Sequence, residues 1–146
     1  MPESKPQNYS NHRRFVPIFH FIALPILGLL LPLYAAVHMV RHPGLQSLVL
    51  LATAFALAAL SLSARLFAIS VQDRVIVLEE KLRYGKILPP DVQALAAKLS
   101  DDQMIGLRFA SDGELADLVR KASEQSLSRD QIKQAVQQWR ADHRRA

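Results

Sequence analysis

The chain has 146 residues, half of which are hydrophobic, and it contains no cysteine and only five glycines. Disulfides, thiolate metal sites and cysteine nucleophiles are therefore excluded, and little glycine remains for a nucleotide-binding loop. The formal net charge of +5 arises around two apolar runs, because residues 87–146 carry equal numbers of basic and acidic side chains. A basic surface of the kind that binds nucleic acid is therefore not expected there.

Two apolar runs follow a polar arm at residues 1–14, which we expect to be irregular and cytoplasmic. Residues 15–40 contain no Asp, Glu, Lys or Arg, and a second uncharged run starts at residue 45. Each run meets the roughly 20 apolar residues that a helix needs to cross a ~30 Å hydrocarbon layer. The first run is also too long for the apolar part of a signal peptide. We therefore predict a transmembrane helical hairpin over residues 15–71, with spans at about 15–40 and 45–71.

Basic residues predict how the hairpin crosses the membrane. Arg13 and Arg14 directly precede the first span, the short turn contains Arg41, and several basic residues follow from Arg65 onwards. Because cytoplasmic flanks carry the excess of Lys and Arg, both termini are predicted to be cytoplasmic. Anionic headgroups attract the same side chains. These four arginines are therefore expected at the membrane interfaces, where Arg65 extends its charge from the span end towards water.

Three prolines interrupt the first span. Pro17 fits the first turn of a helix, whereas Pro25 and Pro32 remove the hydrogen bonds to the carbonyls of Phe21 and Gly28. We expect these prolines to bend the helix. A hinge, or an ion site made from the freed carbonyls, is the alternative to a static bend.

Four of the five histidines lie in or beside the first span, at His12, His20, His38 and His42. Imidazoles in membrane helices can ligate haem or relay protons. The second span contains no histidine, so haem ligation would require two copies of His20 in a homodimer. Placement at the two headgroup regions is the simpler interpretation, and no cofactor or metal is predicted.

Small residues recur along the second span. Ala52 and Ala56, and likewise Ala59 and Ser63, are four positions apart, the small-xxx-small spacing that lets helix backbones approach closely. This pattern predicts a packing face, either against the first span or against another subunit.

The predicted second helix continues beyond the membrane as an amphipathic stem at residues 72–86. Its apolar residues repeat at alternating intervals of four and three, as in a heptad seam: Ala64, Ala68, Val71, Val75, Leu78 and Leu82. Arg74 then occupies position g and Glu79 the following position e, which pair between parallel coiled-coil chains. The seam predicts either self-association or packing against the C-terminal part of the chain. The charged residues Asp73, Arg74, Glu79, Glu80, Lys81 and Arg83 are interpreted as a solvated helix surface.

Residues 87–146 are predicted to form a small cytoplasmic domain of three or four short helices. One helix opens at Asp91, after Pro89 and Pro90. Three capping boxes of the S-x-x-E/Q type open the others, at Ser100–Gln103, Ser111–Glu114 and Ser128–Gln131. The last helix is expected to continue to Trp139, and no strand pattern is present. The predicted core consists of Val92, Leu95, Leu99, Ile105, Leu107, Leu115, Leu118, Val119, Leu127, Ile132, Val136 and Trp139.

Four segments together resemble a family of small bacterial inner-membrane proteins of unknown function: QNYSNHRRFVPIFHF, ARLFAISVQDRVIVLEEKLR, LRFASDGELADLVRKA and IKQAVQQWRADH. The resemblance covers the chain from Gln7 to His143. It implies a bacterial origin and a two-span architecture, and it implies no activity, cofactor or catalytic residue.

We therefore expect a non-enzymatic integral protein of the bacterial inner membrane, with the lipid bilayer and protein subunits as its partners. It would act as an accessory, assembly or scaffold subunit, as a homo-oligomer or within a larger membrane complex. The alternative is a homo-oligomeric channel, although the second span offers few polar residues beyond Thr53, Ser61 and Ser63. Haem binding through the histidines of the first span ranks last.

Overall fold

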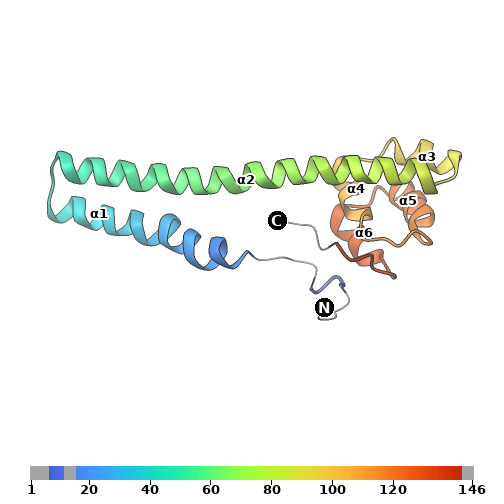
Figure 1. Ribbon diagram of the computed structural model, residues 1–146, viewed down its shortest axis with the longest axis horizontal. Helices are drawn as coiled ribbons and strands as arrows, with labels where there is room; N and C mark the ends of the chain where they lie inside the picture. Colours follow the sequence, from blue (N-terminus) through green and yellow to red (C-terminus); the bar gives the residue numbers. More distant parts are fainter. Residues whose placement is uncertain (1–6, 12–15, 143–146) are drawn as a thin grey trace. The chain divides into compact units, whose positions relative to one another are not determined.

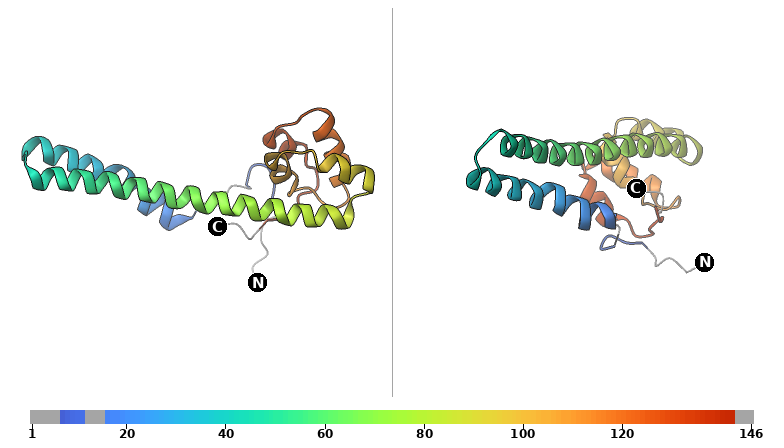
Figure 2. Two further views of the ribbon diagram at one scale, coloured as in Figure 1. Left: turned by 90° about the horizontal axis from the view of Figure 1, so that it is seen from above. Right: turned by 60° about the vertical axis from the view of Figure 1, so that its left-hand side comes forward.

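Helices account for all the regular secondary structure in the computed structural model, which describes residues 7–11 and 16–142. Figures 1 and 2 show their course. Two π-helical segments, η1 (Ile18–Ala23) and η2 (Ile26–Leu30), lead into α1 (Leu31–Arg41) and then α2 (Leu45–Ile87). Four short helices follow: α3 (Pro90–Ala96), α4 (Asp101–Leu107), α5 (Leu115–Glu124) and α6 (Arg129–Ala135). The predicted all-helical class is confirmed for the described residues.

The described chain divides into two compact units. The hairpin unit comprises residues 16–70, and the terminal unit combines residues 7–11 with residues 71–142. Helix α2, 43 residues long, belongs to the first unit over its N-terminal part and to the second over its C-terminal part. The arm that precedes the hairpin thus packs with the segment that follows it.

Prolines shape the first half of the hairpin unit. In η1 and η2 the turns are wider than α-helical: the N–H of Leu24 donates to the carbonyl of Phe19, and that of Leu31 to Ile26. These turns immediately precede Pro25 and Pro32, where the ring would clash with the carbonyl of an ordinary α-turn. The wider turns keep the chain helical through both prolines.

Helix α1 and the first part of α2 run antiparallel and join through a short turn (Figure 1). Segments Ile18–Arg41 and Leu45–Ile87 are each long and apolar enough to cross a membrane, by length and composition alone. Small side chains are the most buried in this unit: Ala35 and Ala54 are fully buried, and Ser47 is 3% exposed. Residues of this size let the two backbones approach closely.

The core of the terminal unit lies between the last turns of α2 and helices α3 to α6. Ile76, Val77, Tyr84 and Leu88 contribute to it from α2 and its end, and Phe109 is its largest fully buried side chain. Every residue of the predicted core is either buried or packed against this cluster. The prediction of a helical core is therefore confirmed, but it omitted Phe109 and the α2 face that completes the core.

Two of the three capping boxes are confirmed. Ser100 with Gln103, and Ser128 with Gln131, each form both reciprocal hydrogen bonds. The box at Ser111 forms only in part: the Ser111 N–H donates to the Glu114 carboxylate at 3.2 Å, but no side chain caps α5, which starts at Leu115. The Glu114 carboxylate accepts hydrogen bonds from the backbone N–H groups of Ser111, Gln137 and Gln138. It therefore ties the chain after α6 to the loop before α5.

The last helix ends earlier than predicted. Helix α6 stops at Ala135, and Val136 is extended. Trp139 then forms an isolated antiparallel bridge with Ala110, and its ring lies 4.8 Å from that of Phe109. The extended backbone places the Trp139 indole against the Phe109 ring. Packing of these two rings therefore outweighs the local helical pattern of the sequence.

Replacing Gly106 by Ala is expected to lower the stability of the terminal unit by about 1–3 kcal/mol. A Cβ atom there would lie 3.0 Å from the carbonyl oxygen of Arg129 and 3.2 Å from a methyl group of Ile132. Gly85→Ala is the matched control, because the added Cβ meets open space in α2. This substitution should raise the free energy of unfolding by about 0.5–1 kcal/mol. Urea unfolding followed by the fluorescence of Trp139, the single tryptophan, measures both. Equal midpoints for the two variants would contradict the close contact of α4 and α6.

Candidate functional site

The part of α2 in the terminal unit has two different apolar faces. One face, formed by Ile76, Val77 and Tyr84, is buried in the core at exposures of 4–7%. The other is the predicted heptad seam, whose members remain exposed by 48–61%: Val71, Val75, Leu78 and Leu82. The C-terminal helices therefore pack against the face that is not the seam. We call these four exposed residues the open seam.

Charged residues flank the open seam as the heptad register requires. Arg74 and Glu79 are both exposed, and neither forms an ion pair with another described residue. Ala64 and Ala68, the earlier members of the predicted seam, are exposed as well. The seam and its flanking charges are thus exposed on the surface of α2 in the single chain.

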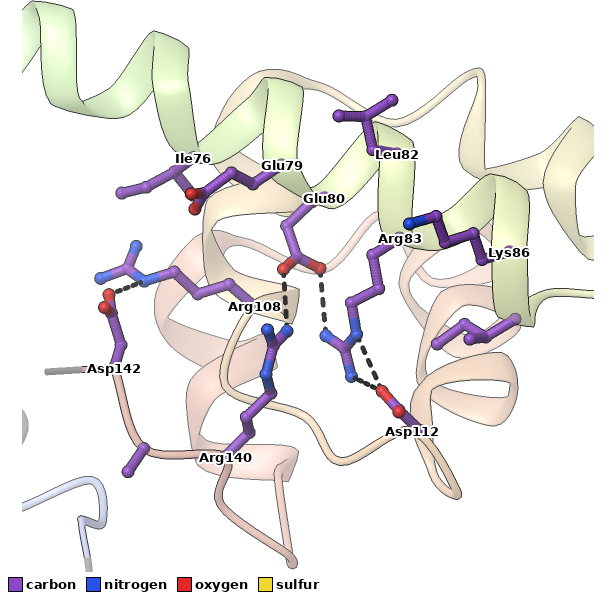
Figure 3. A pocket seen from close by; sticks show the side chains of 12 residues that line it. Ile76, Glu79, Glu80, Leu82, Arg83, Lys86, Arg108, Asp112, Arg140 and Asp142 are labelled. Carbon is purple, nitrogen blue, oxygen red and sulfur yellow. Dashed lines mark hydrogen bonds and ion pairs between the residues drawn. The ribbon is translucent and has the colours of Figure 1, made fainter. Parts of the chain in front are cut away.

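An ionic network fastens the opposite face of α2 to the C-terminal segment (Figure 3). Glu80 accepts hydrogen bonds from Arg83, at 3.1 Å, and from Arg140, at 3.3 Å. Arg83 also donates to Asp112 through Nε and Nη2, at 2.9 and 2.6 Å, and to the Ala110 carbonyl at 2.7 Å. We call Glu80, Arg83, Asp112 and Arg140 the ionic joint. It connects α2, the loop before α5 and the chain after α6.

Burial sets the electrostatics of the ionic joint. Glu80 is 4% exposed, and burial raises the pKa of its carboxyl, opposed by the positive charges of Arg83, Arg140 and Arg108. Burial also raises the pKa of Tyr84, and the charge of Glu80 adds to this effect. The Tyr84 hydroxyl is buried and has no hydrogen-bond partner among the described residues. The tyrosine therefore stays protonated and neutral beside the carboxylate.

A second buried arginine continues the polar contacts. Arg108 is 5% exposed; its Nε donates to Asp142 at 3.0 Å and its Nη1 to the Ile105 carbonyl at 3.0 Å. Its guanidinium carbon lies 4.2 Å from the centre of the Phe109 ring, within range of a cation–π interaction. Lys133 lies 6.0 Å from the same ring. Phe109 thus lies within cation–π range of both Arg108 and Lys133.

An open pocket of about 710 Å³ lies against the ionic joint (Figure 3). Its ionisable lining is balanced, with four basic and four acidic side chains: Arg83, Lys86, Arg108, Arg140, Glu79, Glu80, Asp112 and Asp142. No Ser, Thr, Cys or His lines it among the described residues. The balanced charges favour neither anions nor cations. The arrangement suits a structural connection.

The N-terminal arm contacts the terminal unit through side chains. The Tyr9 hydroxyl donates to Asp130 at 2.8 Å and accepts from Gln134 at 3.1 Å. The side-chain amide oxygen of Gln7, Oε1, accepts a hydrogen bond from the backbone N–H of Asp142 at 2.8 Å. These hydrogen bonds join residues on either side of the hairpin, a feature that no local pattern in the sequence indicated.

Several other predicted positions belong to the hairpin unit. In the hairpin unit Ala52, Ala56 and Ala59 are exposed and Ser63 is half-buried. Arg41 is exposed, and the Arg65 guanidinium lies 5.8 Å from the centre of the Phe19 ring. His12, Arg13 and Arg14 lie outside the described residues. The small-residue face of α2 is thus open in the single chain.

One interpretation of the stem sequence is wrong. Glu80 and Arg83 were expected on a solvated surface with Glu79 and Lys81, but both are largely buried in the ionic joint. The i, i+4 row of Ile76, Glu80 and Tyr84 places Glu80 between two apolar neighbours on one face. This row is the signal that could have identified the joint.

Comparison with known proteins gives a family. A model described as a family of unknown function (DUF6526) matches residues 3–146. The predicted resemblance to a family of unknown function is thereby confirmed, whereas its bacterial and membrane character stays a prediction. No curated protein and no solved structure matches the chain.

Proposed function

Since the chain belongs to the DUF6526 family, which brings no assigned activity, we propose its function from its surfaces. It is a non-enzymatic integral protein of the bacterial inner membrane. The hairpin unit anchors it, and the terminal unit lies in the cytoplasm. Copies of the chain associate through the open seam and form a scaffold or assembly subunit of a membrane complex.

The open seam carries this proposal. Val71, Val75, Leu78 and Leu82 are exposed although α2 already has a helical domain packed against it. A soluble surface rarely leaves a row of large apolar side chains uncovered without a partner. A second copy is the occupant that fits, because Arg74 of one chain and Glu79 of a parallel neighbour have opposite charges at positions g and e.

The contacts of the arm support the proposed topology. Gln7 and Tyr9 hydrogen-bond to residues that follow the second proposed span, and these contacts favour a topology in which both flanks of the hairpin lie in one compartment. A chain with an even number of spans meets this condition, whereas a single span does not. The basic flanks then favour the cytoplasm for both termini.

Purification in a gentle detergent followed by mass measurement tests the proposal. We expect a defined oligomer of this chain, alone or with other subunits, and a lone monomer would contradict the scaffold function. Because the chain has no cysteine, single cysteines introduced at Ser10 and Gly44 test the topology independently. A membrane-impermeant maleimide applied to spheroplasts should label Gly44→Cys and leave Ser10→Cys unlabelled until the cells are lysed. Labelling of both before lysis would contradict the hairpin.

A further inference from the structure

We propose that His38 and His42 form a binding site for a divalent transition-metal ion at the turn of the hairpin. His38 lies in the last turn of α1, and His42, four positions later, is the residue that ends the helix, with a non-helical backbone (φ −136°, ψ 71°). This is the sequence spacing of the two histidines in helical zinc motifs. Their imidazole centres are 5.1 Å apart. This site is independent of the open seam and of the proposed scaffold function.

A chain of hydrogen bonds fixes the tautomer of His38. The Ser47 hydroxyl donates its single proton to the carbonyl of His42, and its oxygen lies 3.0 Å from Nδ1 of His38. Because the hydroxyl proton is already used, Nδ1 of His38 must carry the proton and donate to Ser47. Nε2 of His38 is then the nitrogen with a free lone pair, which is the form that coordinates a metal.

The hydrogen bond to Ser47 is also the outer support that metal-binding histidines need. Ligating imidazoles almost always donate their other N–H to a neighbouring acceptor, which orients the ring. Ser47 is 3% exposed, so this acceptor is held inside the contact between α1 and α2. The site therefore has one oriented ligand before any ion is bound.

His42 supplies the second ligand. Its side chain is exposed, and its ring nitrogens make no hydrogen bond to the described residues. In a tetrahedral site with Zn–N bonds of about 2.0–2.1 Å, the centres of two coordinating rings lie about 5 Å apart. The observed separation of 5.1 Å between the ring centres agrees with this spacing.

Ligand chemistry selects the class of ion. Imidazole nitrogens suit Zn²⁺, Cu²⁺ and Ni²⁺, whereas Mg²⁺ and Ca²⁺ prefer oxygen. Among the described residues, no group of three or more His, Cys, Asp or Glu side chains is placed to hold an ion. A bound ion would therefore keep open positions for water, so the site is one for reversible binding.

Calorimetric titration of the full-length protein, purified in detergent without a polyhistidine tag, tests the site. We expect one Zn²⁺ per chain for the natural protein and no heat of binding with Mg²⁺. His42→Gln should weaken Zn²⁺ binding at least about tenfold, since loss of even an outer partner of a ligand costs about 10–100-fold. His20→Gln, the matched control in the same span, should leave the affinity unchanged.

Variants of Ser47 test whether its hydrogen bond to His38 acts on Zn²⁺ binding or only on the stability of the fold. Ser47→Ala should weaken Zn²⁺ binding about tenfold with unchanged helix content, and Ser47→Thr should restore it. Equal affinity of the natural protein and His42→Gln would overturn the proposal, and so would equal losses in His20→Gln and His42→Gln. Because the His42 side chain is exposed, its replacement leaves the helix packing intact.

Discussion

Replacing Val75 and Leu78 together by Asp is expected to convert the proposed oligomer into monomers and leave the terminal unit folded. Each buried Val or Leu contributes about 1.5–3 kcal/mol when it leaves water, and an unpaired carboxylate in the same place adds a further cost. The loss should weaken association at least about a thousandfold, since 1.4 kcal/mol corresponds to a factor of ten. Mass measurement in gentle detergent gives the oligomeric state.

The fluorescence of Trp139 shows whether the fold survives. Val75 and Leu78 are exposed by 48% and 59% in the single chain, so the domain does not depend on them. Val77→Asp is the matched control on the same helical turn, because Val77 is 7% exposed within the core. That variant should unfold the terminal unit. An unchanged oligomer mass for the Val75 and Leu78 double variant would rule out association through the open seam.

Arg83→Ala is expected to lower the stability of the terminal unit by about 3–5 kcal/mol. Its guanidinium pairs with Glu80 and Asp112, and the side chain is 10% exposed. Removal leaves the buried Glu80 carboxylate with only the more exposed Arg140. Since small domains are stable by about 5–15 kcal/mol in total, urea unfolding followed by Trp139 should show a much lower midpoint.

Two controls make the interpretation of Arg83→Ala specific. Arg120 forms the same kind of pair with Asp91, at 2.8 Å, but its side chain is 39% exposed and that of Asp91 67%, so Arg120→Ala should cost at most about 1 kcal/mol. Combining Glu80→Gln with Arg83→Met should restore part of the loss, because no unpaired buried charge remains. Equal losses for Arg83→Ala and Arg120→Ala would show that the ionic joint contributes no more than a surface pair.

Local signals predicted much of this fold. Ser100 and Ser128 begin helices through both bonds of a capping box, and such boxes need only four consecutive residues. At Ser111 only one of the two bonds of the box forms, for a different physical reason. Glu114 has distant backbone donors at Gln137 and Gln138, and competition from a segment that is remote in sequence is invisible to a local pattern.

The candidate site was predicted only in part. The heptad rule identified the apolar row of Val71, Val75, Leu78 and Leu82. It did not decide whether another copy or the C-terminal part of the chain packs against this row. Glu80 and Arg83 were assigned to solvent, because charged side chains on a helix are usually exposed. Their burial depends on Asp112 and Arg140, which lie far away in sequence and supply the opposite charges.

The sequence by itself determined that this protein is helical, that two of its segments are long and apolar enough to cross a membrane, and which residues of the C-terminal helices contribute most of the predicted part of the core. These properties follow from periodicity, length and hydrophobicity, which act over neighbouring residues. Only the tertiary structure decided which face of α2 the C-terminal helices cover, because α2 offers two apolar rows. Packing around Phe109 and the ionic contacts of Glu80 favour the face of Ile76 and Tyr84, and this choice leaves the seam open.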